Sequence, residues 1–221
     1  MWYRKHSIGK KNTSINRYNQ ITVPMKKKIT YLFISFTLFA ITLNAQTAAK
    51  KEVFSKEFNW TITLPEGFES MSQEEQERIE KKGKDALETT TGIPIENHVK
   101  SIFVFKKDQA HYFEANYQPF DTAVDGNYDE SCKAVYDILF ETFQTQMAGA
   151  KIERFNATEK IDGLEFHTFT VKVQLPNNMV MTMMMFNHLY GKKDLSVNII
   201  YIDPTKGMEM LDSLRKSKFK K

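Results

Sequence analysis

The sequence is poor in the residues that define several specialised classes of protein. Its 221 residues include one cysteine, Cys132, so neither an intramolecular disulfide framework nor a cysteine-rich zinc module can form. Glycine and proline number only 9 and 6, and no Gly/Ser-rich linker or internal repeat divides the chain. At 41% hydrophobic residues it is too apolar for a disordered protein and not apolar enough for a polytopic membrane protein. A single globular domain is the simplest organisation.

Short catalytic and metal-binding motifs are absent as well. The chain has no Gly-x-Ser-x-Gly, no phosphate-binding Gly-rich loop, no His-Glu-x-x-His and no calcium-binding loop. Cys132 is a candidate nucleophile, but it lies on the apolar stripe of an expected helix, where a free cysteine behaves as a small hydrophobic residue. Its candidate bases are His98, His111, His167 and His188, which lack the spacing of zinc ligands. We therefore predict no catalytic, cofactor-binding or metal-binding residue, and no cofactor.

Acidic residues are missing from residues 1–45, which carry eight Lys and Arg. Removing these eight from the total leaves 23 basic against 27 acidic side chains, a net charge of −4 for residues 46–221. The formal charge of +4 therefore belongs to the leader. Nucleic-acid binding needs a concentrated basic face, so an acidic domain argues against a nucleic-acid partner.

The leader has the order of a secretory signal peptide. Lys26-Lys27-Lys28 precedes the mostly apolar segment 29–43, and Ala45 supplies a small residue before a polar stretch. The alternative is an uncleaved membrane anchor, for which this segment is short and contains several Ser and Thr. We expect residues 25–45 to form a cleaved signal peptide, so that the membrane is a partner only if the segment stays uncleaved.

Two further expectations concern this region. Residues 1–24 are polar and basic without apolar periodicity, and we expect them to be a mis-annotated N-terminal extension before a true start at Met25. The ending Leu43-Asn44-Ala45-Gln46 resembles signal peptides of Bacteroidetes. This resemblance implies a mature protein starting near Gln46 in the periplasm, on the outer-membrane surface, or outside a Gram-negative cell.

The rest of the chain is interpreted as a polar lead-in over 46–52 and a single domain over 53–221. Alternating apolar residues predict strands over 54–64, 101–105, 110–117, 152–160, 164–175, 179–190 and 195–202. Apolar stripes and caps predict helices over 72–88, over 129–147 and from Asp203 onward, the last with Met208, Leu211 and Leu214 facing inward. The basic end 215–221 is expected to be solvated.

The expected fold class is α+β, an antiparallel β-sheet sandwiched between helices. The strands 179–190 and 195–202 look apolar on both faces, and such strands lie in sheets covered on both sides. The turn Leu64-Pro65-Glu66-Gly67-Phe68, a long central helix, a three-strand meander and a last helix leading into Ser213–Phe219 follow one another. With these features residues 53–219 resemble the PsbP-like superfamily. This resemblance implies an α/β/α sandwich with an accessory, assembly or binding role, and it transfers no site residue.

One segment keeps a metal hypothesis open. Met179, Met181, Met183 and Met185 share one face of an expected strand, and thioethers are soft ligands that select Cu(I). Methionine also fills gaps between a sheet and a helix, and we expect core packing here. A Met-rich copper-handling protein remains an alternative function.

The combined prediction is an exported, non-enzymatic accessory or binding protein of the bacterial envelope. Its partner is expected to be an envelope protein or a small apolar ligand, and the loop 118–127 with Phe120 is the first surface to consider. The alternative from another class is a hydrolase whose site is assembled from dispersed residues. Asp121-Thr122-Ala123 and Asp212-Ser213-Leu214 match a Bacteroidetes O-glycosylation pattern and are candidate modification sites.

Overall fold

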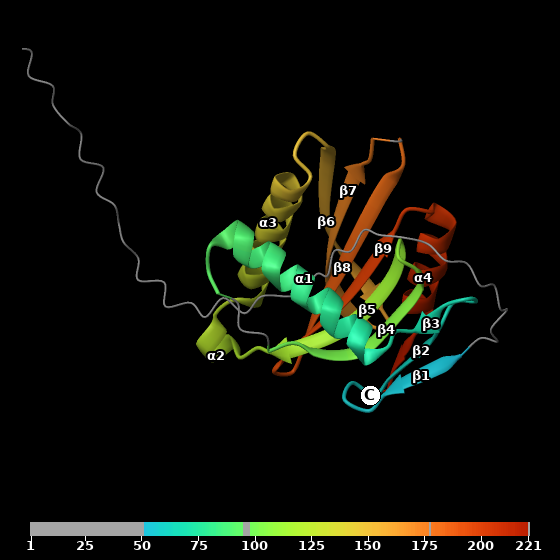
Figure 1. Ribbon diagram of the computed structural model, residues 1–221. Helices are drawn as coiled ribbons and strands as arrows, with labels where there is room; N and C mark the ends of the chain where they lie inside the picture. Colours follow the sequence, from blue (N-terminus) through green and yellow to red (C-terminus); the bar gives the residue numbers. More distant parts are fainter. Residues whose placement is uncertain (1–50, 95–97, 177, 221) are drawn as a thin grey trace, which may run out of the picture.

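The computed structural model describes residues 51–94, 98–176 and 178–220. The expected extension 1–24, the signal peptide 25–45 and most of the lead-in lie outside these ranges. A seven-stranded antiparallel sheet in the order β3-β4-β5-β9-β8-β7-β6 forms the centre of the molecule (Figure 1). Its strands are β3 (Glu69–Ser70), β4 (Lys100–Asp108), β5 (His111–Pro119), β6 (Lys151–Ile161), β7 (Leu164–Gln174), β8 (Val180–Tyr190) and β9 (Lys193–Tyr201).

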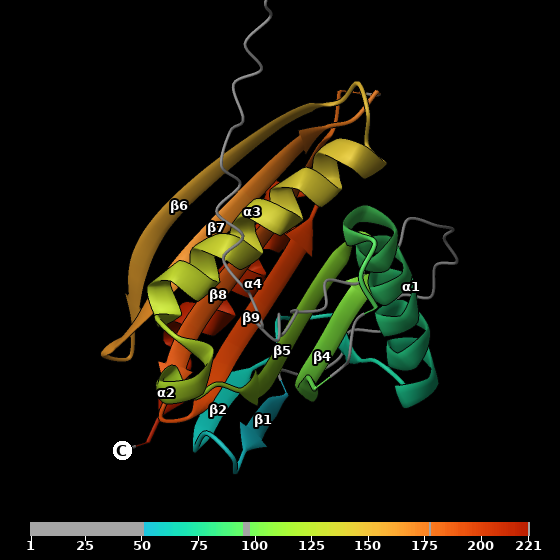
Figure 2. The ribbon, with the colours of Figure 1, turned by 90° about the vertical axis from the view of Figure 1, so that its left-hand side faces the viewer.

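Different elements cover the two faces of this sheet. Helices α1 (Gln73–Thr91) and α3 (Tyr128–Gln146) lie on one face (Figure 2). Helix α4 (Pro204–Lys216) and a small sheet lie on the other, and a short helix α2 (Thr122–Asp125) precedes α3. Each face has its own apolar core cluster. The predicted α+β sandwich is confirmed, with the addition that one outer layer is completed by a second sheet.

The long meander β6–β9 follows the predicted alternation closely. Strand β8 buries Met181, Met183 and Met185 against the α3 side, and Phe186 on the α4 side. Side chains on both faces of β8 therefore lose contact with water, at about 25 cal/mol stabilisation per Å² of apolar surface. This strand has neighbours on both edges in the sheet.

The first predicted strand, 54–64, was wrong as one element. The chain instead forms β1 (Glu52–Ser55) and β2 (Trp60–Thr63), which pair with each other in antiparallel fashion. Asn59 has a φ of +48°, a left-handed conformation that Asn tolerates better than most residues. The reversal at this residue places β1 and β2 in the separate small sheet, whose order is β1-β2-β10.

The basic end of the chain is also not simply solvated. Residues Lys218–Phe219 form β10, which pairs with β2. The Trp60 indole N–H donates to the Ser217 hydroxyl at 2.8 Å, and the Phe219 ring stacks on the Trp60 ring at 5.0 Å. Phe219 and Ser217 are buried, although the neighbouring lysines face solvent. The basic charge of this segment suggests a solvated end, but the buried Phe219 side chain holds the end of the chain in place.

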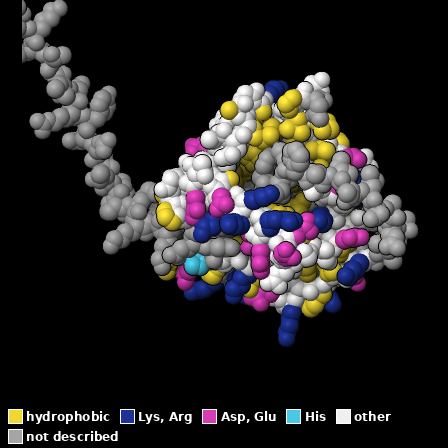
Figure 3. All heavy atoms as spheres, in the orientation of Figure 1, with side chains coloured by type: hydrophobic (Ala, Val, Ile, Leu, Met, Phe, Trp, Pro, Cys, Tyr) yellow, Lys and Arg dark blue, Asp and Glu magenta, His cyan; other side chains and the backbone are white. Residues whose placement is uncertain are grey.

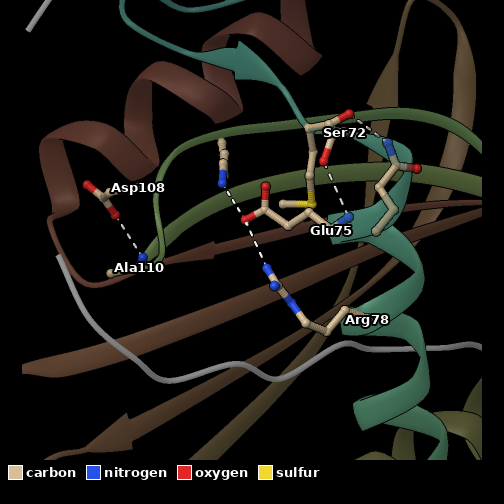
Figure 4. Close-up of polar contacts among 8 residues, drawn as sticks. Ser72, Glu75, Arg78, Asp108 and Ala110 are labelled. Carbon is tan, nitrogen blue, oxygen red and sulfur yellow. Dashed lines mark hydrogen bonds and ion pairs between the residues drawn. The ribbon is translucent and has the colours of Figure 1, made fainter. Parts of the chain in front are cut away.

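Helix α1 begins with the predicted cap. The Ser72 hydroxyl accepts a hydrogen bond from the Glu75 backbone N–H at 3.3 Å (Figure 4). The Glu75 carboxylate does not complete the capping box; it pairs with Lys106 of β4 and lies 3.9 Å from Arg78. Charges of both signs mix over α1, as Figure 3 shows. The helix continues three residues past its predicted end, to a left-handed Gly92.

Helix α4 faces the sheet through a different set of residues from the one predicted. Leu211 and Leu214 are buried as expected, but Met208 is 51% exposed and Met210 takes the inward position. Gly207 lies against the Tyr201 ring, where an added Cβ would approach ring carbons to 2.6 Å. Within the described ranges, no helix has the length and apolarity needed to cross a membrane.

Candidate functional site

Cys132, the candidate nucleophile, lies in the core on α3. Its side chain belongs to the cluster between α3 and the sheet, and burial raises the pKa of the thiol to about 12. The thiolate is the nucleophilic form of cysteine, so this environment opposes activation. The structure therefore supports the expectation of a core thiol.

The candidate histidines are engaged one by one with separate partners. His111 is buried; its Nδ1 lies 2.8 Å from Asp108 Oδ1, and its Nε2 accepts the Asp203 backbone N–H at 3.0 Å. This residue fixes the start of α4. His98 is exposed ahead of β4.

His167 and His188 lie on neighbouring strands but on opposite faces of the sheet. His167 pairs in register with Asn187, so the next residue, His188, points to the other side. His167 Nε2 lies 3.2 Å from Asp129 Oδ1, and His188 Nδ1 lies 2.7 Å from the Glu165 carbonyl. The two imidazoles therefore do not meet. Since His111 is engaged at both ring nitrogens, the His167–Asp129 pair is the one that the hydrolase alternative would use.

The methionine face of β8 is packed. Met181, Met183 and Met185 are at most 5% exposed in the cluster beneath α3, whereas Met179 precedes the strand and is 41% exposed. Thioethers in van der Waals contact with core side chains fill space, as methionine often does. No group of three or more His, Cys, Asp and Glu residues suited to a metal occurs in the described parts of the chain.

The loop 118–127 does not present Phe120 to solvent. Phe120 is 4% exposed and packs edge-on against Tyr128 at 5.2 Å, so it closes the edge of the core. Asp121 caps α2 by accepting the Ala123 N–H at 3.1 Å. Val124 is the large apolar residue exposed in this loop. O-glycosylation at Asp121-Thr122-Ala123 and in α4 remains a prediction.

The most unusual site is a block of polar residues in the middle of the main sheet. Strands β5 and β9 both present three polar side chains toward α1 and α3, and β8 adds one. The members are Glu114, Asn116, Gln118, Asn187, Asp194, Ser196 and Asn198, which we call the polar floor. None is more than 7% exposed. Its β5 and β9 members face one another directly: Glu114 opposite Asn198, Asn116 opposite Ser196, and Gln118 opposite Asp194.

The expectation that strand 195–202 is apolar on both faces was therefore wrong. In β9, Leu195, Val197 and Ile199 face α4. On the other face, Asp194, Ser196 and Asn198 belong to the polar floor, and Ile200 joins the apolar cluster beneath α3. The floor continues as a polar row across the sheet. In register, this row runs Ser101–Asn116–Ser196–Asn187–His167–Thr158.

Asp194 is the centre of one half of the floor. It accepts hydrogen bonds from the Tyr128 hydroxyl at 2.7 Å, the Gln118 amide at 3.2 Å and the Asn187 amide at 3.3 Å. The Tyr136 hydroxyl of α3 in turn donates to Asn187 at 3.1 Å. Burial raises the pKa of Asp194 above its ordinary value, since desolvation outweighs the three hydrogen bonds.

Glu114 is the centre of the other half. Its carboxyl accepts from the Asn116 amide at 2.9 Å and from the Tyr112 hydroxyl at 3.1 Å. Burial raises the pKa of Glu114 to about 7, and the charge of Glu80 on α1 adds to the effect. The floor thus holds two carboxyl groups that are hard to ionise.

Several polar atoms of the floor have no hydrogen-bond partner. Among the described residues, these are Asn116 Oδ1, Gln118 Oε1, Ser196 Oγ, and both Nδ2 and Oδ1 of Asn198. An unsatisfied buried polar group costs about 1–3 kcal/mol, so such atoms are rare unless water or a ligand meets them. Beside Gln118 and Asp194, a cavity of about 10 Å³ has room for about one water-sized group.

A second concave feature lies at the edge of the sheet. Between β1 and β4 an open groove of about 400 Å³ is lined mainly by apolar side chains, including Phe54, Met71, Ile102 and Phe103. On the outer side of β4, the described part of β3 pairs only with Phe105 and Lys106. The first half of β4 therefore faces this groove without a neighbouring strand among the described residues.

The comparisons with known proteins address the fold. No protein-family model and no curated protein sequence matches the chain. Among solved structures, the cyanobacterial PsbP (CyanoP) of Synechocystis sp. PCC 6803 is similar at 10% identity and a TM-score of 0.50. The match covers 82% of this chain and 98% of that one. The Ran-binding protein Mog1p of Saccharomyces cerevisiae matches at 12% identity and a TM-score of 0.39, over 77% and 95% of the two chains. The fold is PsbP-like.

Proposed function

We propose that this chain is an exported, non-enzymatic binding or accessory protein of the bacterial envelope, and that the polar floor is its ligand site. The observation that carries this proposal is the group of five unpartnered polar atoms in a buried part of the main sheet. Polar atoms without partners destabilise the fold, and a bound molecule that forms hydrogen bonds with them would remove this cost. Such a destabilising group is therefore typical of a binding site. The ligand is therefore polar and not the apolar molecule expected from sequence.

The environment of the titratable groups supports binding over catalysis. Cys132 has a raised thiol pKa, and His111 uses both ring nitrogens in structural contacts. The PsbP-like resemblance, in a superfamily of mostly accessory subunits, points the same way.

Export is the part of the proposal carried by sequence alone. The basic and apolar segments before Ala45 have the order of a signal peptide, and they predict a mature protein that begins near Gln46. N-terminal sequencing of protein recovered from the periplasm or the medium tests this. Material that retains residues 29–45 would contradict cleavage, and a first residue before Met25 would contradict the proposed start.

A binding screen tests the ligand site. We expect some member of a panel of small polar metabolites to raise the melting temperature of the mature protein, because a ligand that binds only the folded state stabilises it. The Gln118→Met variant removes an unpartnered acceptor that lines the cavity beside Asp194, and it should weaken that response. Tyr117→Phe, which alters the opposite face of β5, should keep it.

Two outcomes would overturn the proposal. Ligands that stabilise the Gln118→Met variant as well as the natural protein would place binding elsewhere. Measurable turnover of a substrate that is lost on replacing His167 with Ala would favour the hydrolase alternative, through its pair with Asp129.

A second candidate function is docking of an extended segment of an envelope protein, and the groove beside β4 favours it. A peptide in the extended conformation can pair with the free edge of a strand while its side chains enter adjacent pockets. Crosslinking in cells from a photoreactive residue at position 54 checks this, because Phe54 is 53% exposed in the groove. The same probe at Val124 provides a control on a distant exposed apolar residue. An identical set of crosslinked proteins from both positions would count against the groove.

A further inference from the structure

The chemistry of the polar floor specifies what kind of ligand it takes. Asp194 is buried, and its three donors, Tyr128, Gln118 and Asn187, are all neutral groups. No Lys or Arg among the described residues forms an ion pair with it. A buried carboxyl group either stays protonated or is paired with a cation, because removing a lone charge from water is costly. A ligand that carries a positive charge into this position would therefore pair with the ionised form of Asp194.

The free hydrogen-bonding atoms give the same answer independently. Three of the five unpartnered atoms are amide oxygens, on Asn116, Gln118 and Asn198, and these can only accept. One is an amide nitrogen, which can only donate, and the Ser196 hydroxyl can do either. Acceptors exceed donors, so the floor suits a ligand rich in N–H or O–H groups. A carboxylate or phosphate ligand would add acceptors and negative charge to a site that already has both.

The size of the cavity beside Asp194 limits what enters. Its volume of about 10 Å³ accommodates a group the size of one water molecule, such as an ammonium group. Gln118, Asn187 and Asp194 form its inner wall and are buried. Ser131 and Val135 of α3 also line it and are half-buried, so the opening lies on their side. A carbon chain attached to the ammonium group would leave past these two residues.

We infer that the polar floor binds a small primary amine, whose ammonium group occupies this cavity and donates to the Asp194 carboxylate and to Gln118 Oε1. This inference rests on the proposed function and narrows its ligand to one chemical class. Binding supplies the charge partner that Asp194 lacks and satisfies the free Gln118 oxygen in one step. A neutral molecule of the same shape supplies only the second of these contacts.

Three compounds with the same four-carbon chain separate the possibilities. Putrescine carries two ammonium groups, 1,4-butanediol two hydroxyls and succinate two carboxylates. We expect putrescine, at about 100 times its dissociation constant, to raise the melting temperature of the mature protein by about 5 °C. We expect the diol to bind at least tenfold more weakly, and succinate to give no shift. In ¹⁵N NMR spectra, the side-chain amide resonances of Gln118 and Asn187 should move with putrescine.

The variant Asp194→Asn removes the charge and keeps the shape. The Gln118 amide can turn so that its free oxygen accepts from the new amide, which preserves the local hydrogen bonds. This variant should fold and lose its response to putrescine by at least tenfold in affinity. Gln118→Met removes the acceptor that the ammonium group would contact, and it should also weaken the response to putrescine. Tyr117→Phe should respond like the natural protein.

Each failure has a distinct meaning. If the diol or succinate stabilises the natural protein and this stabilisation is lost in Asp194→Asn, the ligand is not an amine. The polar floor would then remain the ligand site. Equal stabilisation by CaCl₂ would assign the cavity to a metal cation instead of an amine. A putrescine response that survives in both variants would place amine binding outside the floor, and no response from any of the three would reject the amine inference.

Discussion

Strands β5 and β9 are buried on both faces, but the two faces differ completely in chemistry. Toward α4 they present Phe113, Ala115, Leu195, Val197 and Ile199, each at most 1% exposed. Toward α1 and α3 the alternate positions form the polar floor, which is nearly as well covered. The same backbone, the same register and similar burial therefore support an apolar core on one side and a polar site on the other.

The apolar face stabilises the fold, and the polar face is the site of the proposed ligand binding. Burial of large apolar side chains contributes about 1.5–3 kcal/mol each, whereas buried polar atoms without partners lower stability. A sheet selected for stability alone would carry apolar residues on both faces at its centre. Local costs of this kind concentrate at functional sites, and that is the reason to place ligand binding on the α1 and α3 side.

The largest expected effect comes from the apolar face. Replacing Phe113 with Ala removes a buried ring that stacks on Phe105 at 5.6 Å, and should lower the free energy of unfolding by about 3–5 kcal/mol. Urea denaturation measures this. The matched change on the other face, Asn116→Ala, removes a single hydrogen bond to Glu114 and should cost about 1 kcal/mol. Equal losses in the two variants would contradict the division of roles between the faces.

An intermediate effect concerns the pH dependence of the polar face. The folded-state pKa of Glu114, about 7, lies above its ordinary value of 4.5, so the folded state binds its proton more tightly than the unfolded state. The contribution is thus present below pH 4.5 and is lost as the pH rises through 7, a loss of about 3 kcal/mol by pH 8. The Glu114→Gln variant has no carboxyl group to ionise here and does not lose this stability. Its unfolding free energy relative to the natural protein should therefore rise by about 3 kcal/mol from pH 5 to pH 8.

The control for this measurement is Glu153→Gln on β6. Lys151 lowers the pKa of Glu153, so the contribution of that carboxylate is lost only as the pH falls below about 4.5. The difference in unfolding free energy between Glu153→Gln and the natural protein should therefore stay constant between pH 5 and pH 8. If the unfolding free energy of Glu114→Gln relative to the natural protein is also independent of pH, Glu114 is not desolvated.

The smallest expected effect is a gain in stability. Asn198 has no partner for either side-chain polar atom and lies opposite Met185 and Glu114. Changing it to Leu, of similar volume, removes the desolvation cost and should raise the free energy of unfolding by about 1–2 kcal/mol, as measured in urea. A loss of stability would indicate that an ordered water or a neighbouring group already satisfies Asn198.

The sequence predicts the apolar side of this comparison much better than the polar side. The meander β6–β9 and helix α3 follow from periodicity, because their inward positions are occupied by large apolar residues. The polar floor does not, because Ser196 and Asn198 alternate with apolar residues in the pattern that usually marks a solvent-facing strand. Asp194 lies just before the predicted strand 195–202, and Gln118 lies in the expected loop 118–127. The available signal was three polar residues at every second position in each of two strands.

Other differences have local causes. The break between β1 and β2 depends on one residue, Asn59, in a left-handed conformation without a glycine to signal it. Strand β10 is two residues long, too short for any periodicity. The shift from Met208 to Met210 in α4 depends on how the helix is rotated against the sheet, which one apolar stripe does not determine.

The contact between Trp60 and Ser217 joins residues 157 positions apart. Synthesis proceeds from the amino end, so β1 and β2 leave the ribosome long before β10. Until then one edge of β2 has no partner strand, and the Trp60 indole lacks its contacts with Ser217 and Phe219. Contacts of such long range form slowly, and unpaired strand edges favour aggregation in partly made chains. Completion of the small sheet is therefore a late event in the synthesis of each chain, because β2 gains its second neighbouring strand only when the last few residues arrive.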